Sequence, residues 1–321
     1  MKFKIIPIAG DASFRKFYRV ILNKKSKIIV FAEKDKHKNL KAYIAINKFL
    51  RENKILAPKL LDYNYSEGII GIEDFGDITF HKVLLKKKKR LNTYKKLIDL
   101  LIKIQKIKPN RSIKIINKNM HTIKKYSNKY LLKESNLFFD WYLPLFLTRK
   151  KSLNIKKKTN KLLIKIYKKL NFTNSCFVHR DYHVQNLMKV GKKIGVIDSQ
   201  DALIGNPAYD LASIIDDVRI KNSKKIKNEI YSYYLKKKSK EFKKNAHNFL
   251  EDFEILSVQR SLKIIGIFSR LFVRDKKKQY LKLIPYAWKL LEMRMHSKIF
   301  SDLRFCLNTN IPSKFKKRII Y

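Results

Sequence analysis

The sequence has little cysteine, glycine and proline, and few acidic residues. Its 321 residues include two cysteines, eight glycines and seven prolines. Two cysteines, Cys176 and Cys306, cannot build a disulfide framework in a chain this long, which predicts a reducing compartment. No apolar run approaches the roughly 18 residues that a membrane helix needs, so no membrane insertion is expected. These absences predict a soluble protein of the cytoplasm.

Basic residues outnumber acidic ones by 75 to 26, which gives a net charge of +49 at pH 7. Such an excess is typical of nucleic-acid or membrane-surface binders when the basic residues gather on one face or in a tail. Here lysine runs are scattered, at Lys86–Lys89, Lys156–Lys158, Lys236–Lys238 and Lys276–Lys278. Lysine also far outnumbers arginine, the residue that contacts bases and phosphates bidentately. We therefore favour lysines spread over solvated surfaces, and expect no nucleic-acid partner.

Hydrophobic residues make up 45% of the chain, which is enough for a buried core and excludes an intrinsically disordered protein. In the first 75 residues, short apolar runs alternate with turn residues, and Asn39–Asn53 shows apolar residues at helical spacing. The expected strands are Ile5–Ile8, Phe14–Leu22, Lys27–Phe31, Lys59–Tyr65 and Ile69–Glu73. This predicts a small antiparallel sheet with one helix.

After Gly76 the apolar period changes to 3.6, which indicates helices. The expected helices are Leu91–Ile107, Asn119–Lys133, Ile155–Leu170, Ala208–Asp217, Ile226–Leu235, Ala246–Leu271 and Gln279–Arg294. Short strands are expected between them at Cys176–Val178, Leu187–Val190 and Ile194–Ile197. The predicted fold class is α+β, with a sheet lobe over residues 1–75 and a larger, mainly helical lobe over residues 76–321.

The segment from Phe177 to Leu187 carries the clearest chemical signal. His179-Arg180-Asp181 is separated by four residues from Asn186, which is the spacing of a kinase catalytic loop. In such a loop a carboxylate accepts a hydrogen bond from the attacking hydroxyl, and an amide oxygen reaches a Mg²⁺ ion. Asp181 is therefore the candidate catalytic base, Asn186 a candidate metal ligand, and His179 the residue that braces the loop.

The apolar run Ile194–Ile197 leads into Asp198, which stands twelve residues after Asn186. A second metal-binding carboxylate is expected here, so that Asn186 and Asp198 hold Mg²⁺ ions that bridge the phosphates of ATP. The residues that follow exclude a protein kinase, because Ser199-Gln200 replaces Phe-Gly and only eleven residues separate Asp198 from Asp210. Since no peptide-docking segment fits in that interval, we expect a small-molecule acceptor.

These motifs resemble a known family. His179–Asn186, Asp198 and Asn206–Ala212 are similar to the aminoglycoside phosphotransferase/choline kinase superfamily. Gly10–Arg15, Ile197–Ala202 and Gln259–Phe268 resemble one branch of it, the bacterial anomeric kinases for N-acetylmuramate and N-acetylglucosamine, which act in peptidoglycan sugar recycling. The resemblance extends from about residue 8 to about residue 290.

The resemblance implies a protein-kinase-like bilobal fold that binds ATP between its lobes. It implies that Asp210 is a structural residue behind the catalytic loop. It also implies that Glu73-Asp74-Phe75 is the hinge that meets adenine, with Glu73 and Phe75 as nucleotide contacts. Gly10–Ser13 would cover the phosphates with backbone N–H groups, Ser13 among them; an ordinary hairpin loop is the alternative.

The chain departs from the wider superfamily in one respect. A third-strand lysine paired with a helix glutamate is not evident, because Lys27–Phe31 ends in Ala32-Glu33-Lys34 and residues 39–50 contain no glutamate. The cation for the α- and β-phosphates is therefore left open among Arg15, Lys16 and Lys34.

Several polar residues near the metal-binding segment are candidate acceptor contacts. Gln200 and Asp201 directly follow the metal carboxylate and could bind sugar hydroxyls, and His183 and Gln185 could do so from the catalytic loop. Trp141 lies in the densest aromatic cluster of the chain and could stack on a sugar ring, although such clusters are more often part of a core.

A second group of acceptor candidates lies on one stripe of the expected helix 246–271. Gln259, Lys263, Gly266 and Arg270 share this stripe, with Arg260 beside it. A solvated face is one interpretation. The other is a cationic site for the lactyl carboxylate of muramate.

We therefore predict an ATP- and Mg²⁺-dependent kinase that phosphorylates the anomeric hydroxyl of a small-molecule sugar, N-acetylmuramate or N-acetylglucosamine. The first alternative is a phosphotransferase of the same fold that acts on an aminoglycoside, choline or another amino alcohol. Those acceptors are cationic and favour an acidic cleft, whereas this chain is basic. The second alternative is a non-catalytic, basic nucleic-acid-binding protein on a kinase scaffold, against which the complete motif set argues. The sequence is silent on protein partners.

Overall fold

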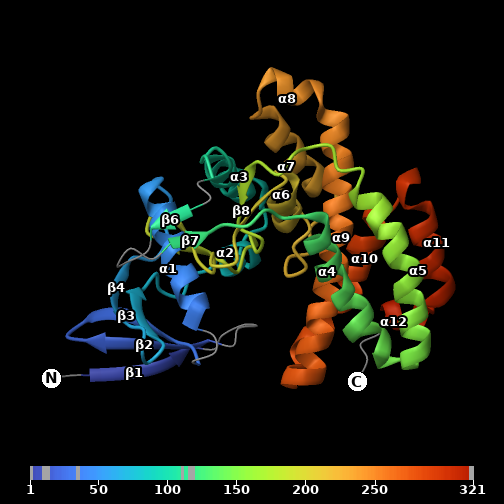
Figure 1. Ribbon diagram of the computed structural model, residues 1–321. Coiled ribbons are helices and arrows are strands. Elements are labelled where there is room, and N and C mark those ends of the chain that lie inside the picture. Colours follow the sequence, from blue (N-terminus) through green and yellow to red (C-terminus); the bar gives the residue numbers. More distant parts are fainter. Residues whose placement is uncertain (1–2, 9–14, 34–36, 110–111, 115–119, 318–321) are drawn as a thin grey trace. The chain divides into compact units, whose positions relative to one another are not determined.

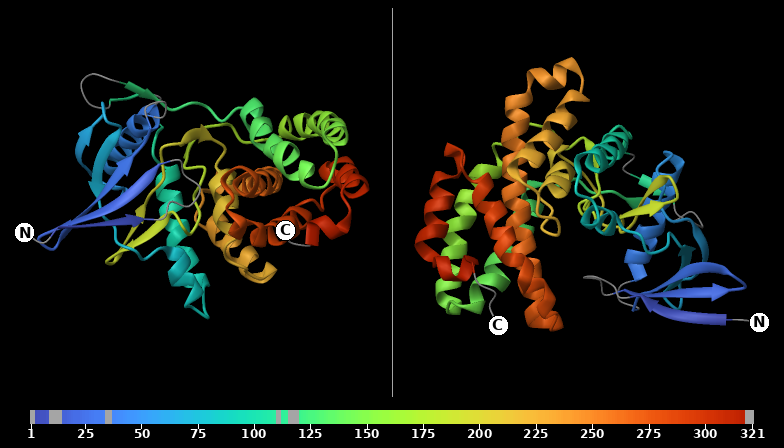
Figure 2. Two further views of the ribbon diagram at one scale, coloured as in Figure 1. Left: turned by 90° about the horizontal axis from the view of Figure 1, so that it is seen from below. Right: turned by 180° about the vertical axis from the view of Figure 1, so that it is seen from behind.

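The computed structural model describes residues 3–8, 15–33, 37–109, 112–114 and 120–317 (Figures 1 and 2). The chain divides into two compact units. The first contains the described residues of Met1–Lys124 together with Cys176–Ile204, and the second contains Lys125–Ser175 with the described residues of Gly205–Tyr321. The predicted lobes 1–75 and 76–321 follow the change from strand to helix, and that division stays a prediction.

The first unit contains a five-stranded antiparallel sheet with the strand order β1-β2-β3-β5-β4. Its strands are β1 (Phe3–Ile8), β2 (Lys16–Leu22), β3 (Lys25–Phe31), β4 (Leu60–Asn64) and β5 (Ile69–Glu73). Asn23 and Lys24 form the turn between β2 and β3, with φ angles of 48° and 66°. Two positive φ angles are typical of the two-residue turn whose twist matches that of a hairpin, which explains why Leu22 pairs with Lys25.

Helix α1 (His37–Glu52) lies beside this sheet, as Figure 1 shows. Its apolar face buries Leu40, Ile46 and Leu50, while Val30 and Ile70 are buried from the sheet. The ring of Phe49 also stacks on Phe177, with the ring centroids 5.9 Å apart. The core of the first unit therefore joins α1 to the strand that precedes the catalytic loop.

The rest of the first unit consists of short elements. These are α2 (Phe80–Leu85), α3 (Leu91–Gln105), the pair β6 (Ser112–Lys114) and β7 (Met120–Thr122), the pair β8 (Cys176–Val178) and β11 (Leu203–Gly205), and the hairpin β9 (Leu187–Val190) and β10 (Lys193–Val196). The predicted helix Asn119–Lys133 is wrong in its first half. The chain forms β7 there, and a helix begins only after Ser127, whose side chain accepts a hydrogen bond from the backbone N–H of Tyr130.

The second unit is mainly helical. Its helices are α4 (Asn128–Leu137), α5 (Arg149–Tyr167), α6 (Ala208–Ile215), α7 (Lys224–Lys236), α8 (Lys240–Lys244), α9 (Ala246–Asp275), α10 (Ile284–Arg294), α11 (Ser301–Asn310) and α12 (Ser313–Lys317). Shorter turns of helix are η2 (Phe138–Tyr142), η3 (Leu143–Leu145), η4 (Lys278–Leu283) and η5 (Lys298–Phe300). The predicted fold class, a small antiparallel sheet with one helix followed by a mainly helical part, is confirmed.

Helix α9 packs closely against the end of α4 at Gly266. A Cβ atom added at Gly266 would lie 2.2 Å from the carbonyl carbon of Leu137 and 2.4 Å from the backbone nitrogen of Phe138. Because backbone atoms cannot give way as a flexible side chain can, Gly266→Ala is expected to lower the free energy of unfolding by about 1–3 kcal/mol. Urea denaturation of both proteins measures this loss. Ser269→Ala on the same helix removes an atom instead of adding one and is the control; an equal loss in both variants would contradict the packing explanation.

A buried ion cluster joins three helical segments of the second unit. Asp216 accepts from Lys227 Nζ at 2.9 Å and from Arg294 Nε at 2.8 Å, and both Asp216 and Lys227 are buried. Burial raises the pKa of Asp216, but the charges of Lys227 and Arg294 outweigh it and lower this pKa from 3.8 to about 2. A depressed pKa in the folded state means that the contribution to stability is present above pH 3.8 and is lost as the pH falls toward 2.

We therefore expect the stability difference between the native chain and Asp216→Asn to shrink as the pH falls from 5 to 2. A pKa shift of this size corresponds to a change on the order of 2 kcal/mol. Urea denaturation across this pH range measures it. Asp140→Asn removes an exposed carboxylate that pairs with Lys156 and is the matched control. A difference for Asp216→Asn that stays constant with pH would contradict the assignment.

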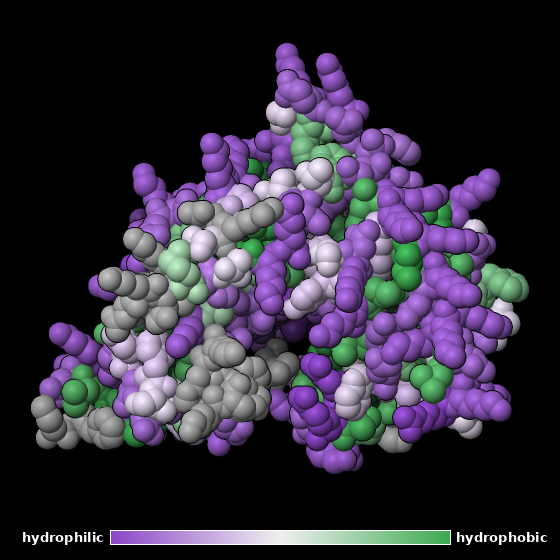
Figure 3. Space-filling view, in the orientation of Figure 1, coloured by the Kyte–Doolittle hydropathy of each residue, from purple (hydrophilic) through white to green (hydrophobic). Residues whose placement is uncertain are grey.

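Figure 3 shows hydrophilic residues spread over the face in view instead of gathered in a single patch. Within the described residues, none of the helices combines the length and the apolar character needed to span a membrane.

Candidate active site

The catalytic-loop segment follows β8 and is held by its own backbone. The N–H of His183 donates to the carbonyl of Asp181 at 2.9 Å, and the N–H of Asn186 donates to the carbonyl of His183 at 2.9 Å. The side-chain Nδ2 of Asn186 also donates to the carbonyl of Asp181, at 3.0 Å. Since the amide nitrogen of Asn186 is used in this way, its amide oxygen is the atom that could bind a cation.

Two buried side chains anchor this loop to the rest of the first unit. The hydroxyl of Tyr182 donates to the carbonyl of Leu97 in α3 at 2.7 Å. The Nε2 atom of His179, whose side chain is fully buried, lies 3.1 Å from the carbonyl oxygen of Ile197. His179 therefore connects the start of the loop to the residue that precedes Asp198, and its role in bracing a catalytic loop stays a prediction.

The β9–β10 hairpin brings Asn186 and Asp198 together. Leu187 pairs with Val196 in this hairpin, and the N–H of Ile197 donates to the carbonyl of Asn186 at 3.0 Å. One predicted metal ligand directly precedes the hairpin and the other comes two residues after it, so both lie at its open end. Asp198 has a left-handed backbone, with φ of 63°, a conformation that Asp and Asn tolerate better than most residues. Its side chain is 39% exposed and so is accessible to a ligand.

The chemistry of these two side chains fits Mg²⁺. A carboxylate oxygen and an amide oxygen are hard ligands, the kind that Mg²⁺ prefers. Among the described residues there is no group of three or more His, Cys, Asp or Glu side chains that could hold a metal ion. A site with two protein oxygens suits a Mg²⁺ ion that takes its remaining ligands from phosphates and water, as is usual in kinase sites.

Two of the three candidate phosphate cations, Arg15 and Lys16, are among the described residues, and of these two Arg15 lies at this site. Its Nη2 lies 2.5 Å from Asp198 Oδ1, and its Nη1 donates to Gln200 Oε1 at 3.1 Å. Lys16 is exposed, with its ammonium 6.0 Å from the ring centroid of Phe31. Lys34 and Ser13 lie outside the described residues.

Helix α1 contacts residues 198–201, here called the metal-binding segment after the predicted ligand Asp198, through Asn47, a residue that the sequence interpretation did not single out. Ser199 Oγ donates to Asn47 Oδ1 at 2.7 Å, and Asn47 Nδ2 donates to the carbonyl of Pro58 at 3.3 Å. A polar residue on the otherwise apolar stripe of α1 was the signal available in the sequence. The contact that α1 makes with Ser199 is therefore a hydrogen bond between two neutral side chains.

A lysine of β3 and a glutamate of α1 are both present among the described residues, but each has a different partner. Lys27 of β3 pairs with Asp62, and Glu52 of α1 lies 3.9 Å from Lys48.

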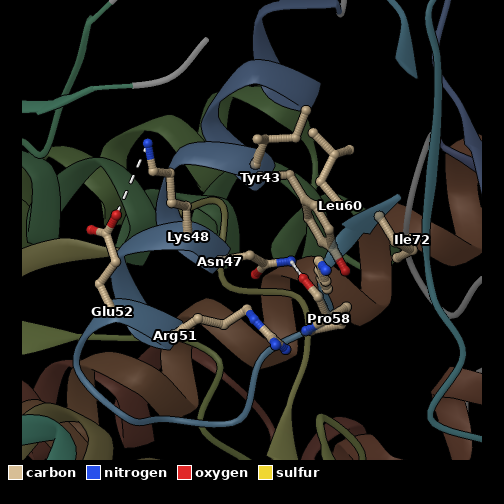
Figure 4. Close-up of a pocket in the computed structure, with 10 residues that line it drawn as sticks. Tyr43, Asn47, Lys48, Arg51, Glu52, Pro58, Leu60 and Ile72 are labelled. Carbon is tan, nitrogen blue, oxygen red and sulfur yellow. Dashed lines mark hydrogen bonds and ion pairs between the residues drawn. The ribbon is translucent and has the colours of Figure 1, made fainter. Parts of the chain in front are cut away.

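Asn47 and Tyr43 also line a pocket between α1 and the residues Pro58, Leu60 and Ile72, with a volume of about 240 Å³ (Figure 4). Figure 4 shows the Asn47 amide directed at Pro58 and the Tyr43 ring beside Leu60. The rim carries Arg51, which donates to Glu73 Oε2 at 3.1 Å. Of these lining residues, Asn47 also contacts Ser199.

The predicted hinge is fixed by an arginine on β2. Arg19 donates to both carboxylate oxygens of Asp74, at 2.6 and 3.0 Å, and to Asp77 at 2.9 Å. Burial raises the pKa of Asp74, but the hydrogen bonds from Arg19 and from the N–H of Gly76 outweigh it and hold the pKa below its usual value. Asp74 therefore stays ionised at neutral pH, and its ion pair with Arg19 ties this segment to β2.

The other two hinge residues have separate surroundings. Phe75 is buried against Gly195 of β10, where an added Cβ would lie 2.6 Å from the Phe75 ring. Phe75 thus packs on the hairpin that joins Asn186 to Asp198. The backbone N–H of Glu73 donates to the carbonyl of Lys59 at 2.9 Å, and its carboxylate accepts from Lys59 N–H and Arg51. The roles of Glu73, Phe75 and Ser13 toward a nucleotide stay predictions.

Gln200 and Asp201 form a short polar chain after the metal carboxylate. Gln200 accepts from Arg15 and donates through Nε2 to Asp201 Oδ2 at 3.0 Å. Arg180 in turn donates to the carbonyl of Asp201 at 3.0 Å. Gln200 and His183 are buried, Gln185 is half-buried and Asp201 is exposed. Asp201 is therefore the more accessible of the two residues for an acceptor hydroxyl.

The second group of acceptor candidates lies in the second unit and is not a solvated face. Gln259, Arg260 and Lys263 are all buried, so that interpretation is wrong. Lys263 Nζ lies 3.1 Å from Glu134 of α4, and Gln259 Nε2 donates to the Leu131 carbonyl and to Glu134. The helical period identified a common stripe but could not show that a carboxylate of α4 faces it.

Aromatic residues complete this buried polar cluster. Tyr126 donates its hydroxyl to Glu134, and Tyr209 accepts from Lys263 Nζ at 3.3 Å. The Arg260 guanidinium carbon lies 5.2 Å from the Tyr209 ring centroid. Of the remaining predicted residues in this unit, Asp210 is fully buried in the first turn of α6, and Trp141 in η2 is half-buried among buried aromatic neighbours.

Comparisons with known proteins place this site in context. A family model described as the phosphotransferase enzyme family matches residues 4–241. A curated relative, the N-acetylmuramate/N-acetylglucosamine kinase of Neisseria meningitidis serogroup B, is 26% identical over 289 residues, which are 88% of this chain and 83% of the relative.

Solved structures show the same fold. The choline kinase LicA from Streptococcus pneumoniae has a TM-score of 0.61 at 12% identity, covering 90% of this chain and 93% of that one. The ADP-bound aminoglycoside phosphotransferase APH(2'')-Ib has a TM-score of 0.59 at 15% identity, covering 90% of this chain and 92% of that one. Both structures have a protein-kinase-like fold. Because their sequence identity to this chain is low, the similarity supports the fold and nothing further.

Proposed function

This chain belongs to the phosphotransferase enzyme family, and from that membership we propose that it transfers the γ-phosphoryl group of ATP to the anomeric hydroxyl of N-acetylmuramate or N-acetylglucosamine. The observation that carries the proposal is the hairpin that brings Asn186 and Asp198 together beside the loop of Asp181. The choice of acceptor is supported by relatives named N-acetylmuramate/N-acetylglucosamine kinase that match most of the chain. The proposed setting is cell-wall sugar recycling in the cytoplasm.

Each side chain has a separate role in the proposed reaction. Asp181 accepts the hydrogen bond of the anomeric hydroxyl and orients that oxygen for in-line attack. Asn186 and Asp198 would hold Mg²⁺, which when bound neutralises charge on the phosphates of ATP. The use of ATP is supported by the ADP-bound neighbour of the same fold. Ser13, Glu73 and Phe75 are the proposed nucleotide contacts.

The test is ADP release by the purified chain with MgATP and four acceptors offered in parallel: N-acetylmuramate, N-acetylglucosamine, kanamycin and choline. Turnover on the two amino sugars alone is expected, and ³¹P NMR should then show an anomeric sugar phosphate. Asp181→Asn is the blank. Asp62→Asn, which removes a half-exposed carboxylate that pairs with Lys27 on the sheet, is the matched control.

The other outcomes separate the alternatives. Turnover on kanamycin or choline would retain the phosphotransferase mechanism and overturn the proposed acceptor. A chain that binds nucleic acid with a steep dependence on salt, and keeps doing so in Asp181→Asn and Asp198→Asn, would favour the non-catalytic alternative.

A further inference from the structure

Arg15 is buried where an unneutralised guanidinium would be costly. Its side chain is 3% exposed, and its guanidinium carbon lies 5.4 Å from the ring centroids of both Phe17 and Tyr43. Burial raises the pKa of Tyr43 to about 12, so its ring presents a neutral face to the cation. The two aromatic rings, from β2 and α1, fix the plane of the guanidinium and leave its N–H groups directed along that plane.

Those N–H groups bind the metal-binding segment at two points. One contacts Asp198 Oδ1 at 2.5 Å and the other contacts Gln200 Oε1 at 3.1 Å. Asp198 is also the proposed Mg²⁺ ligand, and a ligand oxygen that accepts a short charge-assisted hydrogen bond is less available to a second cation. Arg15 and a metal ion therefore compete for the same carboxylate.

The position of Arg15 also suits a contact to polyphosphate. If Asp198 and the phosphates of ATP hold the same Mg²⁺ ion, the phosphate chain would lie beside the carboxylate that Arg15 contacts. The guanidinium is held at that carboxylate by Gln200 and the two rings. Its planar fork matches phosphate oxygens as well as it matches carboxylate oxygens.

We propose that Arg15 occupies Asp198 in the nucleotide-free protein, yields it when MgATP binds, and then donates to the phosphate chain of the nucleotide. In this role Arg15 replaces the third-strand lysine of the wider superfamily, and Gln200 holds it in place of the helix glutamate. The inference rests on the proposed function only in taking ATP as the nucleotide and Asp198 as a metal ligand. If Arg15 has this role, metal binding depends on bound nucleotide, because a metal ion that arrives without nucleotide must displace the buried guanidinium of Arg15 from Asp198.

The test measures the affinity for a metal ion and the affinity for ATP separately. Loss of an arginine with a purely structural role would change both affinities in the same direction. In Arg15→Gln, Mn²⁺ used as a probe without nucleotide and followed by electron paramagnetic resonance should bind about tenfold more tightly, because its carboxylate has lost a competing cation. In the same variant, metal-free ATP measured by calorimetry should bind about tenfold more weakly. Lys16→Gln removes the same charge from the neighbouring, exposed residue and should change neither affinity.

Further variants keep the inference testable if Arg15→Gln does not fold. Arg15→Lys keeps the charge but offers only one ammonium, and should retain part of the ATP affinity. Asp198→Asn releases Arg15 from its carboxylate and should bind metal-free ATP more tightly than the native chain does. Equal losses of Mn²⁺ and ATP affinity in Arg15→Gln, or ATP binding that is unchanged in both Arg15→Gln and Asp198→Asn, would overturn the proposal. None of these measurements uses an acceptor, so they stand apart from the test of the proposed function.

Discussion

Asp181→Asn is expected to lower kcat by about 10²–10⁴-fold while the affinity for ATP changes little. Asparagine has the same shape as aspartate, and the backbone carbonyl of residue 181 still accepts from His183 and Asn186. The loop therefore keeps its form. What is lost is the anionic acceptor that orients the attacking hydroxyl, which acts on the reaction and not on the binding of the nucleotide.

Steady-state kinetics with saturating acceptor, together with calorimetric titration of ATP, measure the two quantities separately. Asp62→Asn is the control for the loss of one negative charge in the first unit. An Asp181→Asn protein in which kcat and ATP affinity fall by the same factor would contradict the role of a base and would indicate damage to the whole site.

The proximity of Asn186 to Asp198 could be predicted from the sequence because the information for it is local. Asp181 and Asn186 belong to one loop, and the hairpin that follows returns the chain to Asp198 by pairing Leu187 with Val196. An apolar strand pattern on both sides of a turn is enough to infer such a return. The five strands of the sheet were predictable for the same reason, since each is paired with a neighbour through short connections or through one helix.

Contacts between distant segments could not be predicted in this way. Arg15 is 183 residues from Asp198, and the sequence offered Lys16 and Lys34 as equal candidates because charge type alone does not show which side chain points inward. The contact between Asn47 and Ser199 could not be predicted either, because a polar residue on an apolar helical stripe does not show which distant side chain it binds.

The stripe of Gln259 and Lys263 shows that the sequence can identify a shared helical face without showing whether that face is buried. Helical spacing established that these residues share a face of α9, and their polarity suggested solvent. Burial was decided by Glu134, which lies on a different helix and accepts from both side chains. A buried lysine is tolerated only where such a carboxylate is present, and no periodicity in one segment can report that.

Asp198→Asn is expected to abolish turnover, with a loss of about 10³-fold or more, because it removes the only charged oxygen ligand among the two proposed for Mg²⁺. The variant is chosen over Asp198→Ala for a structural reason. The φ of residue 198 is 63°, and a residue that disfavours the left-handed region would add a backbone cost of about 1 kcal/mol. Asparagine tolerates this conformation and keeps an oxygen near Arg15, so a loss of activity can be assigned to the metal ligand.

The measurement is turnover as a function of Mg²⁺ concentration, with thermal unfolding as the check on the fold. Asp62→Asn, which removes a half-exposed carboxylate that pairs with Lys27, serves as the control and should keep its dependence on Mg²⁺. An Asp198→Asn protein with native turnover would refute the metal assignment. A protein that is inactive and also unfolds at a much lower temperature would instead show that the ion pair with Arg15, at 2.5 Å, stabilises the first unit as well. The two carboxylates of the site therefore differ in what their loss reveals: Asp181 reports on the reacting hydroxyl, and Asp198 on the cations that hold the phosphates.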